Sequence, residues 1–407
     1  MKVEQLRTEF PLLEEKVYGK QLVYLDNAAT IQRPRSVVDK WNTLTLHCNS
    51  NLHRAVHKIA ADATEEYETT RDVVREFLNA ESRQEIIFTS GATASINLVA
   101  FSFGEAFIQK GDEIIVAESE HHSNIVPWQM MCNRKHAVIK VLPVDDRGCL
   151  RVDMLESLIS DKTRLLAVAQ ISNVLGIRNP VKEIVRIAHS RGVKVLVDGA
   201  QGVVHDGADV RDLDCDFYAF SGHKVYAAPG TGILYGKKEL LDRMPPYMGG
   251  GEMIANVKFT GTTYAPLPGK YEAGTQNMAS TPTLKPALEM AKSLKDREIS
   301  DYHENLTSYV LGALNSNPKI HLYGNPEDVS AKTSIFSFTL EGVHHEDLAL
   351  ILDKMGVAVR SGQMCAEPLM DRFGVTGMLR ASFAHYNTME EAAYFIKSLD
   401  KAAAMLL

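Results

Sequence analysis

Short apolar runs alternate with amphipathic stretches along most of the first 280 residues. Continuous apolar runs predict buried strands at Glu85–Thr89, Glu113–Ala117, Val138–Leu142, Leu165–Gln170, Lys194–Val197, Phe217–Phe220 and Gly232–Tyr235. Helical periodicity between several of these runs predicts helices over Thr93–Phe107, Ser123–His136 and Val181–Arg191. Strands without polar alternation that are connected by helices favour an α/β fold, with a largely parallel sheet covered on both faces.

The pattern changes after about residue 280. One long helix is predicted over Thr283–Asn315, and further helices over His345–Met355 and Met389–Leu407. Strands are predicted between them at Ile320–Gly324, Ser334–Leu340, Val357–Arg360 and Leu379–Phe383. This order indicates a smaller α+β domain at residues 281–407, after a large domain at residues 21–280. We expect residues 1–20 to form an N-terminal segment that packs with the small domain.

Composition and charge limit the classes of function. The chain has 407 residues, of which 45% are hydrophobic and 23% charged, as in ordinary globular proteins and unlike disordered or fibrous ones. Its net charge of −7 disfavours binding to nucleic acid or to an anionic membrane surface. The sequence shows no signal peptide and no apolar stretch long enough to span a bilayer. Five sparse cysteines indicate reduced thiols, so we expect a cytoplasmic protein.

Three predicted strands end in groups with possible chemistry. Ser90-Gly91-Ala92-Thr93 opens a helix and offers an anion site, Asp198 follows the second strand, and Lys224 follows the third. Alone, each has an ordinary explanation as a helix cap, a turn cap or a surface lysine. Together they match pyridoxal phosphate, which needs an anion site for its phosphate, a carboxylate for its ring nitrogen and a lysine for its aldehyde.

Other ligands fit the sequence less well. The glycines at 230 and 232 lack the third glycine of a dinucleotide-binding turn, and no phosphate-binding loop with the GxxxxGK[ST] pattern occurs. His121 and His122 have no metal-like partner one helical turn away, so we expect no metal site.

Seven segments, in this order, carry a resemblance to a known family. They are EHHSNIVPWQ (120–129), SNVLG (172–176), VDGAQ (197–201), DFYAFSGHK (216–224), EAGTQN (272–277), RSGQMCAEPLM (360–370) and LRASFAHYNT (379–388). The sequence resembles the class V aminotransferase branch of fold-type I pyridoxal-phosphate enzymes, and more closely the group II cysteine desulfurases of the SufS and CsdA kind. The resemblance runs from about Phe10 to the C-terminus. It implies a large domain with a mostly parallel seven-stranded sheet and a smaller C-terminal α+β domain that carries a catalytic cysteine loop.

The resemblance also implies roles for residues around the cofactor. Lys224 would hold the cofactor as a Schiff base and then move protons at the substrate. Asp198 would pair with the ring nitrogen, Gln201 would bond the ring hydroxyl oxygen, and His121 would stack on the ring and act in catalysis. The phosphate would be held by Ala92, Thr93, Ser221 and His223, and by Thr275 of the other subunit of a homodimer.

The substrate and the reaction follow from the same resemblance. Asn173 and Arg380 would bind the substrate carboxylate, while Arg360, His53 and Arg54 would lie near the mouth of the pocket. L-Cysteine would lose its sulfur to Cys365, giving L-alanine and a persulfide. A SufE- or SufU-like protein would accept that sulfur for iron–sulfur cluster assembly. The alternatives are a selenocysteine lyase acting on L-selenocysteine, another class V aminotransferase or eliminase, and a catalytically impaired scaffold that needs a partner.

Two departures from the family pattern stand out. Gln363 and Met364 precede Cys365, where relatives usually have a histidine next to the cysteine. The helix start usually reads Gly-Thr-Thr-Glu in the family, whereas this chain has alanine at positions 92 and 94. The first departure bears on how Cys365 is activated, and the second removes a hydroxyl near the phosphate.

Overall fold

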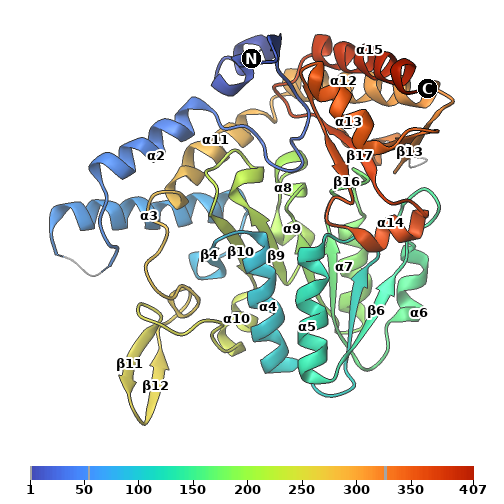
Figure 1. Cartoon of the computed structure of the whole chain (residues 1–407). Coiled ribbons are helices and arrows are strands. Elements are labelled where there is room, and N and C mark those ends of the chain that lie inside the picture. Colours follow the sequence, from blue (N-terminus) through green and yellow to red (C-terminus); the bar gives the residue numbers. More distant parts are fainter. Residues whose placement is uncertain (1, 54–55, 325–327) are drawn as a thin grey trace.

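A computed structural model of the chain describes residues 2–53, 56–324 and 328–407 (Figure 1). Its centre is a seven-stranded sheet in the order β4-β10-β9-β8-β7-β5-β6. β10 runs antiparallel to both β4 and β9, and the other pairs are parallel. The predicted fold class, with a mostly parallel sheet of seven strands, is therefore confirmed. The strands are β4 (Ile86–Thr89), β5 (Glu113–Ala117), β6 (Val138–Leu142), β7 (Thr163–Ala169), β8 (Lys194–Asp198), β9 (Phe217–Ser221) and β10 (Gly232–Gly236).

The apolar runs of these strands are buried on both faces of the sheet. On β8, Leu196 packs into one hydrophobic cluster, while Val195 and Val197 pack into the other. The first cluster includes side chains of α4 (Ala92–Phe107), α5 (Val126–Lys135) and α10 (Lys238–Arg243). The second includes side chains of α6 (Leu155–Leu158), α7 (Val181–Ser190), α8 (Gly202–His205) and α9 (Val210–Leu213). Each fully buried aliphatic side chain contributes roughly 1.5–3 kcal/mol, so this two-sided burial fixes the sheet between its helices.

A second, antiparallel sheet follows in the C-terminal part, in the order β13-β14-β17-β16. Its strands are β13 (Ile320–Tyr323), β14 (Ile335–Leu340), β16 (Arg360–Gly362) and β17 (Met378–Ser382). A separate hydrophobic cluster joins it to α12 (Arg297–Ser316), α13 (His345–Lys354) and α15 (Met389–Leu406). α14 (Glu367–Phe373) follows β16 after a short loop, and this loop contains Cys365.

Two predicted elements of this region are wrong in detail. The single helix predicted over Thr283–Asn315 is two helices, α11 (Leu284–Ser293) and α12, and the Asp296 side chain caps the second by accepting the Glu298 N–H at 3.0 Å. The predicted strand Val357–Arg360 is also divided. β15 (Val357–Ala358) pairs in parallel with β3 (Val23–Tyr24), whereas β16 pairs with β17.

The N-terminal segment contacts both parts of the chain. It contains α1 (Val3–Arg7), β1 (Lys16–Val17) and β2 (Lys20–Gln21), and it leads into β3. Arg7 forms a 2.7 Å ion pair with Glu391, which lies at the start of α15. The N-terminus accordingly lies near this helix (Figure 1). The Phe10 ring contacts Tyr386 of the C-terminal part and Tyr226, which follows β9. The domain boundaries at 20 and 280 stay predictions.

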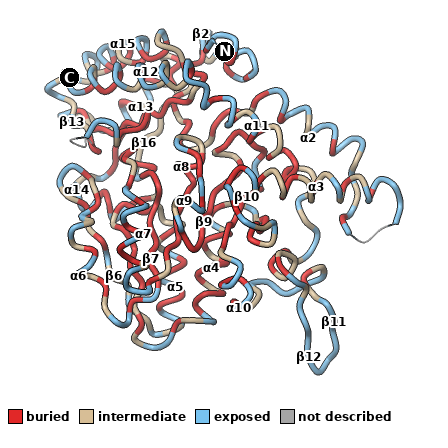
Figure 2. The backbone as a smooth tube through the Cα atoms, turned by 180° about the vertical axis from the view of Figure 1, so that it is seen from behind, coloured by how far each residue is buried: buried red, intermediate tan, exposed pale blue. Residues whose placement is uncertain are grey.

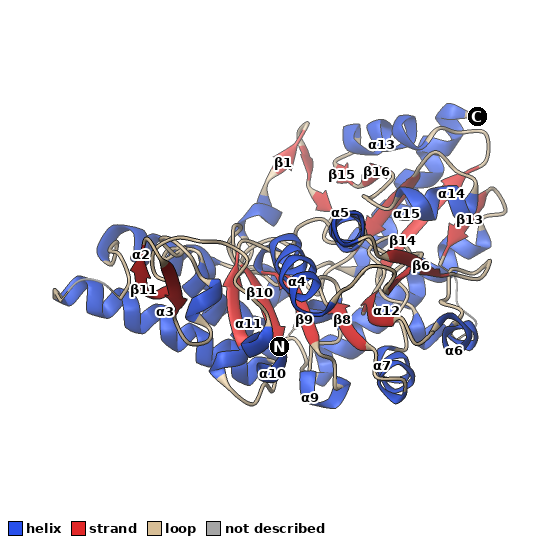
Figure 3. Cartoon of the chain, turned by 90° about the horizontal axis from the view of Figure 1, so that it is seen from below, coloured by secondary structure: helices blue, strands red, loops and turns tan. Residues whose placement is uncertain are grey.

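Sequence analysis did not predict three elements that extend away from the main body. They are α2 (Arg35–His47), α3 (Lys58–Phe77) and the hairpin of β11 (Ile254–Lys258) and β12 (Gly261–Tyr264) (Figures 1 and 3). α2 buries little more than Val37 and Leu44, and both hairpin strands are largely exposed (Figure 2). So few buried residues leave little apolar periodicity in α2 and the hairpin, whereas the buried face of α3 includes the polar residues Thr70 and Arg71.

The longest helices of the described ranges are α3 and α12, with 20 residues each. Both carry charged residues along their length. Within residues 2–53, 56–324 and 328–407, no helix combines the length and the apolar character that crossing a bilayer requires.

A buried ion pair joins α3 to the central sheet. The fully buried Arg71 guanidinium on α3 forms hydrogen bonds to both carboxylate oxygens of Glu272, at 2.6 and 2.9 Å, and to the Ile86 carbonyl at 2.8 Å. Glu272 also accepts the Phe88 N–H of β4 at 2.8 Å. This bidentate pair places the segment that begins at Glu272 against the edge strand β4.

We expect Glu272→Gln to lower the free energy of unfolding by about 3 kcal/mol, because the buried Arg71 charge then loses its counter-charge. Thermal unfolding followed by circular dichroism should show a melting temperature lower by at least about 4 °C. Glu289→Gln, which neutralises an exposed carboxylate on α11, is the control and should leave the melting temperature nearly unchanged. Equal melting temperatures for the two variants would contradict this account.

Candidate active site

A cavity of about 220 Å³ lies where the ends of β7, β8 and β9 meet the beginning of α4. Ala28 and Ala29, which follow β3, and residues of the small sheet and the Cys365 loop complete its walls. This is the carboxyl edge of a parallel sheet, where α/β proteins bind their ligands. Most of the site residues predicted from sequence line it: Ala92, Thr93, His121, Asn173, Asp198, Gln201, Ser221, His223, Lys224, Arg360, Cys365 and Arg380.

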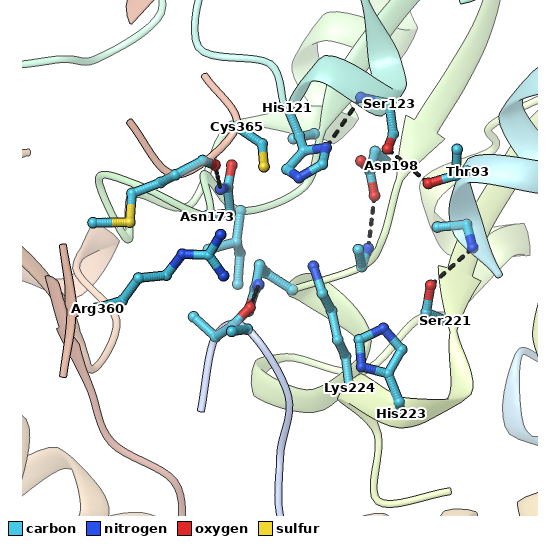
Figure 4. Close-up of a pocket in the computed structure, with 18 of the residues that line it drawn as sticks. Thr93, His121, Ser123, Asn173, Asp198, Ser221, His223, Lys224, Arg360 and Cys365 are labelled. Carbon is cyan, nitrogen blue, oxygen red and sulfur yellow. Dashed lines mark hydrogen bonds between the residues drawn. The ribbon is translucent and has the colours of Figure 1, made fainter. Parts of the chain in front are cut away.

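Lys224 extends into this cavity from the single turn η5 (Gly222–Lys224) that follows β9 (Figure 4). Burial lowers the pKa of its ammonium group, and the Asp198 carboxylate opposes this shift. The guanidinium groups of Arg380 and Arg360 lower the pKa further. A lysine with a lowered pKa is more often neutral at physiological pH, and the neutral amine is the form that attacks carbonyl carbons.

Asp198 is the last residue of β8; it is buried and lines the cavity. Its carboxylate accepts the Ala200 N–H at 2.9 Å, which fixes its orientation (Figure 4). Burial raises the pKa of this carboxyl, and the Lys224 ammonium opposes that shift. A protonated ring nitrogen placed opposite Asp198 would favour the ionised carboxylate, because opposite charges in a buried site stabilise each other.

The beginning of α4 forms the anion-binding side of the cavity. The Ser221 hydroxyl accepts the Ala92 N–H at 2.8 Å, and the Thr93 hydroxyl is 2.7 Å from that of Ser123. Gly232 on β10 allows this close approach, since a Cβ there would lie 2.3 Å from the Gly91 Cα. Burial and the nearby Lys224 lower the pKa of His223 to about 4, so its ring is neutral. Hydroxyls and free N–H groups at the N-terminus of a 16-residue helix suit a phosphate.

These groups fit pyridoxal phosphate. A helix N-terminus for the phosphate, the Asp198 carboxylate for the ring nitrogen and the Lys224 amine for the aldehyde all border one cavity. Gln201 adds an amide beside them, and its Nε2 donates to the Ala28 carbonyl at 2.7 Å. Within the described ranges, no group of three or more His, Cys, Asp and Glu side chains is placed to hold a metal ion.

His121 lies on another wall of the cavity, at the start of the turn η3 (His122–Asn124). Its Nδ1 accepts the Ser123 N–H at 3.0 Å (Figure 4). Burial, together with the charge of Lys224, lowers the pKa of His121 to about 3. The ring is therefore neutral with its proton on Nε2, and it can stack on a flat cofactor without adding positive charge.

Arg380 and Asn173 form the end of the cavity away from α4. The buried Arg380 donates to the Asn173 carbonyl at 2.9 Å and to an Asp26 carboxylate oxygen at 3.0 Å. Its Nε is buried without a hydrogen-bond partner among the described residues. A guanidinium with an unused donor is suited to a carboxylate ligand.

Cys365 lies in the loop between β16 and α14, and its sulfur points into the cavity beside His121 (Figure 4). Met364 and Cys365 both have the left-handed backbone conformation, with φ of 53° and 58°. Two such residues in succession are costly unless other contacts fix them. Asn173 Nδ2 donates to the Met364 carbonyl at 2.9 Å, and the His122 N–H donates to the Cys365 carbonyl at 2.8 Å. These two hydrogen bonds from Asn173 and His122 therefore fix the Cys365 loop against the large domain.

The remaining predicted residues do not line this cavity in a single chain. His53 lies outside it, with its Nε2 3.5 Å from a Glu68 carboxylate oxygen. The substrate contact expected of His53 is therefore not formed within one chain. Thr275 is exposed and also lies outside the cavity. Arg54 lies outside the described residues.

Sequence analysis missed several residues that support the site. Glu120 is buried behind His121 and accepts the Asn124 side-chain amide at 2.6 Å and the Ala169 N–H at 2.8 Å, so it fixes the turn that carries His121. Burial raises the pKa of Glu120 to about 8. The sequence did indicate Glu120 in one way: it is a carboxylate shortly after β5, and it begins the EHHSN motif. The roles of Asp26 and Ala28 could not be predicted, because their hydrogen-bond partners Arg380 and Gln201 are distant in the sequence.

Comparisons with known proteins agree with this geometry. The family model described as aminotransferase class-V matches residues 23–395. A cysteine desulfurase from Cronobacter sakazakii is 45% identical over 405 residues, covering 99% of both chains. The crystal structure of the cysteine desulfurase CsdA (S-sulfonic acid) from Escherichia coli has a TM-score of 0.92 at 40% identity, with full coverage of both chains. An apo cysteine desulfurase from Thermococcus onnurineus has a TM-score of 0.93 at 33% identity, covering 100% of this chain and 99% of that one.

The family resemblance read from the sequence motifs is confirmed by these matches. The matched region contains the strand-end residues Asp198 and Lys224 as well as the Cys365 loop. The chain belongs to the class V aminotransferase family, whose cysteine desulfurases depend on pyridoxal phosphate.

Proposed function

We propose that this protein is a cysteine desulfurase that converts L-cysteine to L-alanine and leaves the sulfur as a persulfide on Cys365. The observation that carries the proposal is the cavity itself, in which a cysteine faces a lysine, a buried carboxylate and a buried arginine. Full-length relatives named cysteine desulfurase support it. Iron–sulfur cluster assembly in the cytoplasm is the destination we assign to the sulfur, with a SufE- or SufU-like protein as its acceptor.

The cofactor would be held by groups on three walls. Lys224 would bind its aldehyde carbon, Asp198 its ring nitrogen and Gln201 its ring oxygen, with His121 stacked on the ring face. Its phosphate would contact the N-terminus of α4 and the side chains of Thr93, Ser221 and His223. When bound, pyridoxal phosphate withdraws electrons from the α-carbon of an amino acid.

Arg380 and Asn173 would bind the substrate carboxylate and orient its side chain toward the loop of Cys365. The Cys365 sulfur then attacks the substrate sulfur. The carbon–sulfur bond breaks as the sulfur–sulfur bond forms, so Cys365 is oxidised to the persulfide and the substrate carbon is reduced. Lys224, whose amine lies at the centre of the cavity, moves the proton at the α-carbon. Alanine and a protonated persulfide account for all atoms of L-cysteine and the thiol.

The thiol needs to ionise before it attacks. Arg360 and Arg380 line the same cavity as Cys365 and are the cationic side chains on its substrate side. Met364 occupies the position of the family's usual histidine, and its side chain is buried with 3% exposure. We infer that the two arginines supply the positive charge near this thiol, since the residue before it has no ionisable group.

The enzyme would act as a homodimer. Large apolar side chains are exposed on the α2–α3 region and the hairpin, including Trp41 at 45%, Leu46 at 73% and Phe259 at 114%. Exposed apolar surface of this kind favours burial against another chain. Thr275 lies between the hairpin and α11, and we propose that it reaches the phosphate in the partner's site.

The first test follows the sulfur. After the yellow holoenzyme is mixed with excess L-cysteine in the absence of reductant, mass spectrometry should find added sulfur on the Cys365 peptide and alanine in solution. Cys365→Ser should lose at least about 100-fold of the rate on L-cysteine, because the nucleophile is gone. Cys149→Ser, which changes a half-buried cysteine of a different cavity, is the matched control and should retain full activity.

Several results would contradict the assignment. Sulfur on Cys48, Cys132, Cys149 or Cys215 would exclude Cys365 as the acceptor. Undiminished turnover of L-cysteine by Cys365→Ser would indicate an aminotransferase or an eliminase. Activity of that variant retained on L-selenocysteine alone would indicate a selenocysteine lyase.

The second test asks whether Thr275 acts in the partner's site. Thr275→Asp places a negative charge beside the cofactor phosphate and should weaken cofactor binding, and Lys224→Ala should abolish turnover. A mixed dimer of these two chains contains one site with its own Lys224 and the partner's Thr275. When the two variants are denatured together and refolded, we expect the mixed dimers to regain the activity of one of their two sites. Mixing that restores nothing, although both variants refold as dimers by light scattering, would place Thr275 in its own chain's site. Full activity of Thr275→Asp before mixing would place it in no site.

A further inference from the structure

The loop of Cys365 is held by a histidine that the proposed chemistry does not use. His122 follows the cavity residue His121, but its imidazole is absent from the cavity lining. Its Nε2 accepts the N–H of Glu367, the first residue of α14, at 3.1 Å. Its own backbone N–H donates to the Cys365 carbonyl at 2.8 Å. His122 thus contacts this region twice, at Cys365 through its backbone and at Glu367 through its ring.

The loop needs such support because of its backbone and its sequence. Met364 and Cys365 are consecutive left-handed residues that are not glycine. α14 begins without a side-chain cap of its own, since Ala366 stands at the N-cap position and Pro368 lacks an N–H. Glu367 therefore has one of the few free N–H groups at this helix start, and the His122 ring accepts it. The ring nitrogen takes the place of a capping oxygen.

The turn η3 connects this support to the cofactor wall. His121 caps η3 through its Nδ1, and the Asn124 N–H donates to the His121 carbonyl at 2.7 Å. The two neighbouring histidines therefore have fixed and different directions, one toward the cavity and one toward the loop. A displacement of either ring would change the distance between the cysteine loop and the cofactor wall.

We propose that His122 is a positioning residue, whose Nε2 fixes the loop so that the Cys365 sulfur is aligned for attack. This inference rests on the proposed function of Cys365. It assigns to His122 an acceptor role toward the Glu367 N–H, and it gives His122 no part in binding the cofactor or the substrate carboxylate. Asn173 contacts the loop at the Met364 carbonyl, and Arg372 connects the far end of α14 to Val144 and Asp146. His122 contacts the beginning of the helix, next to Cys365.

A pair of amide variants separates the acceptor role from a general structural role. In His122→Gln the side-chain oxygen can take the position of Nε2, whereas in His122→Asn it reaches only the position of Nδ1. We expect His122→Asn to slow single-turnover persulfide formation on Cys365 about tenfold, the effect of losing one ordinary hydrogen bond, with KM for L-cysteine and the absorbance change on substrate binding unaltered. His122→Gln should restore the rate to within about twofold.

Hydrogen exchange of the holoenzyme gives a second readout that does not depend on activity. Amides of the peptide covering residues 363–369 should exchange about tenfold faster in His122→Asn than in the parent and in His122→Gln. His344→Ala is the control, because it removes another histidine acceptor at a helix start: His344 Nδ1 accepts the Glu346 N–H at 3.4 Å, outside the cavity. It should change neither the persulfide rate nor exchange in this peptide.

The outcomes are distinct. Equal persulfide rates for His122→Asn and the parent, or equal losses for the Asn and Gln variants, would overturn the acceptor role. A loss of bound cofactor or a raised KM with an unchanged maximal rate would assign His122 to the cofactor or substrate site instead. If the parent enzyme forms no persulfide on Cys365, the proposed function fails, and the exchange experiment still decides whether His122 holds the loop.

Discussion

The site depends on the meeting of an amine and a buried carboxylate at the end of a parallel sheet. β8 and β9 are neighbours and run in the same direction, so Asp198 and the turn that carries Lys224 emerge at the same edge. Burial disfavours the charged form of each group, and each opposes the shift of the other's pKa. An isolated charge at this depth would be too costly to keep. The parallel direction of the strands therefore brings together a reactive amine and the carboxylate that makes its burial tolerable.

Much of the large domain could be predicted from the sequence, because its signals are local. Each strand of the central sheet is a short apolar run, and the groups at the strand ends follow these runs directly. Ser90–Thr93, Asp198 and Lys224 could thus be assigned to one edge before the strand order was known. The break between α11 and α12 was missed because apolar periodicity continues through Leu294, whereas the N-cap at Asp296 begins a new helix by a local hydrogen bond.

The supporting part of the site could not be predicted in the same way. Arg380 was assigned from a motif, but its partner Asp26 is 354 positions away in the sequence and carries no distinctive pattern. Glu120 and Asn124 look like ordinary polar residues until burial makes their hydrogen bonds obligatory. His53 was placed near the pocket by family likeness, whereas in one chain it pairs with Glu68, since local packing and not motif order determines where an exposed ring points.

The pairing of β3 with β15 has a consequence for biosynthesis. Residues near position 25 leave the ribosome early, yet β15 and Arg380 are translated close to the end of the chain. During most of translation β3 therefore lacks its partner strand β15, and the cavity lacks the wall formed by the small sheet. A nascent or prematurely terminated polypeptide therefore lacks the wall that contains Arg380, and the complete cavity forms only when synthesis is nearly finished.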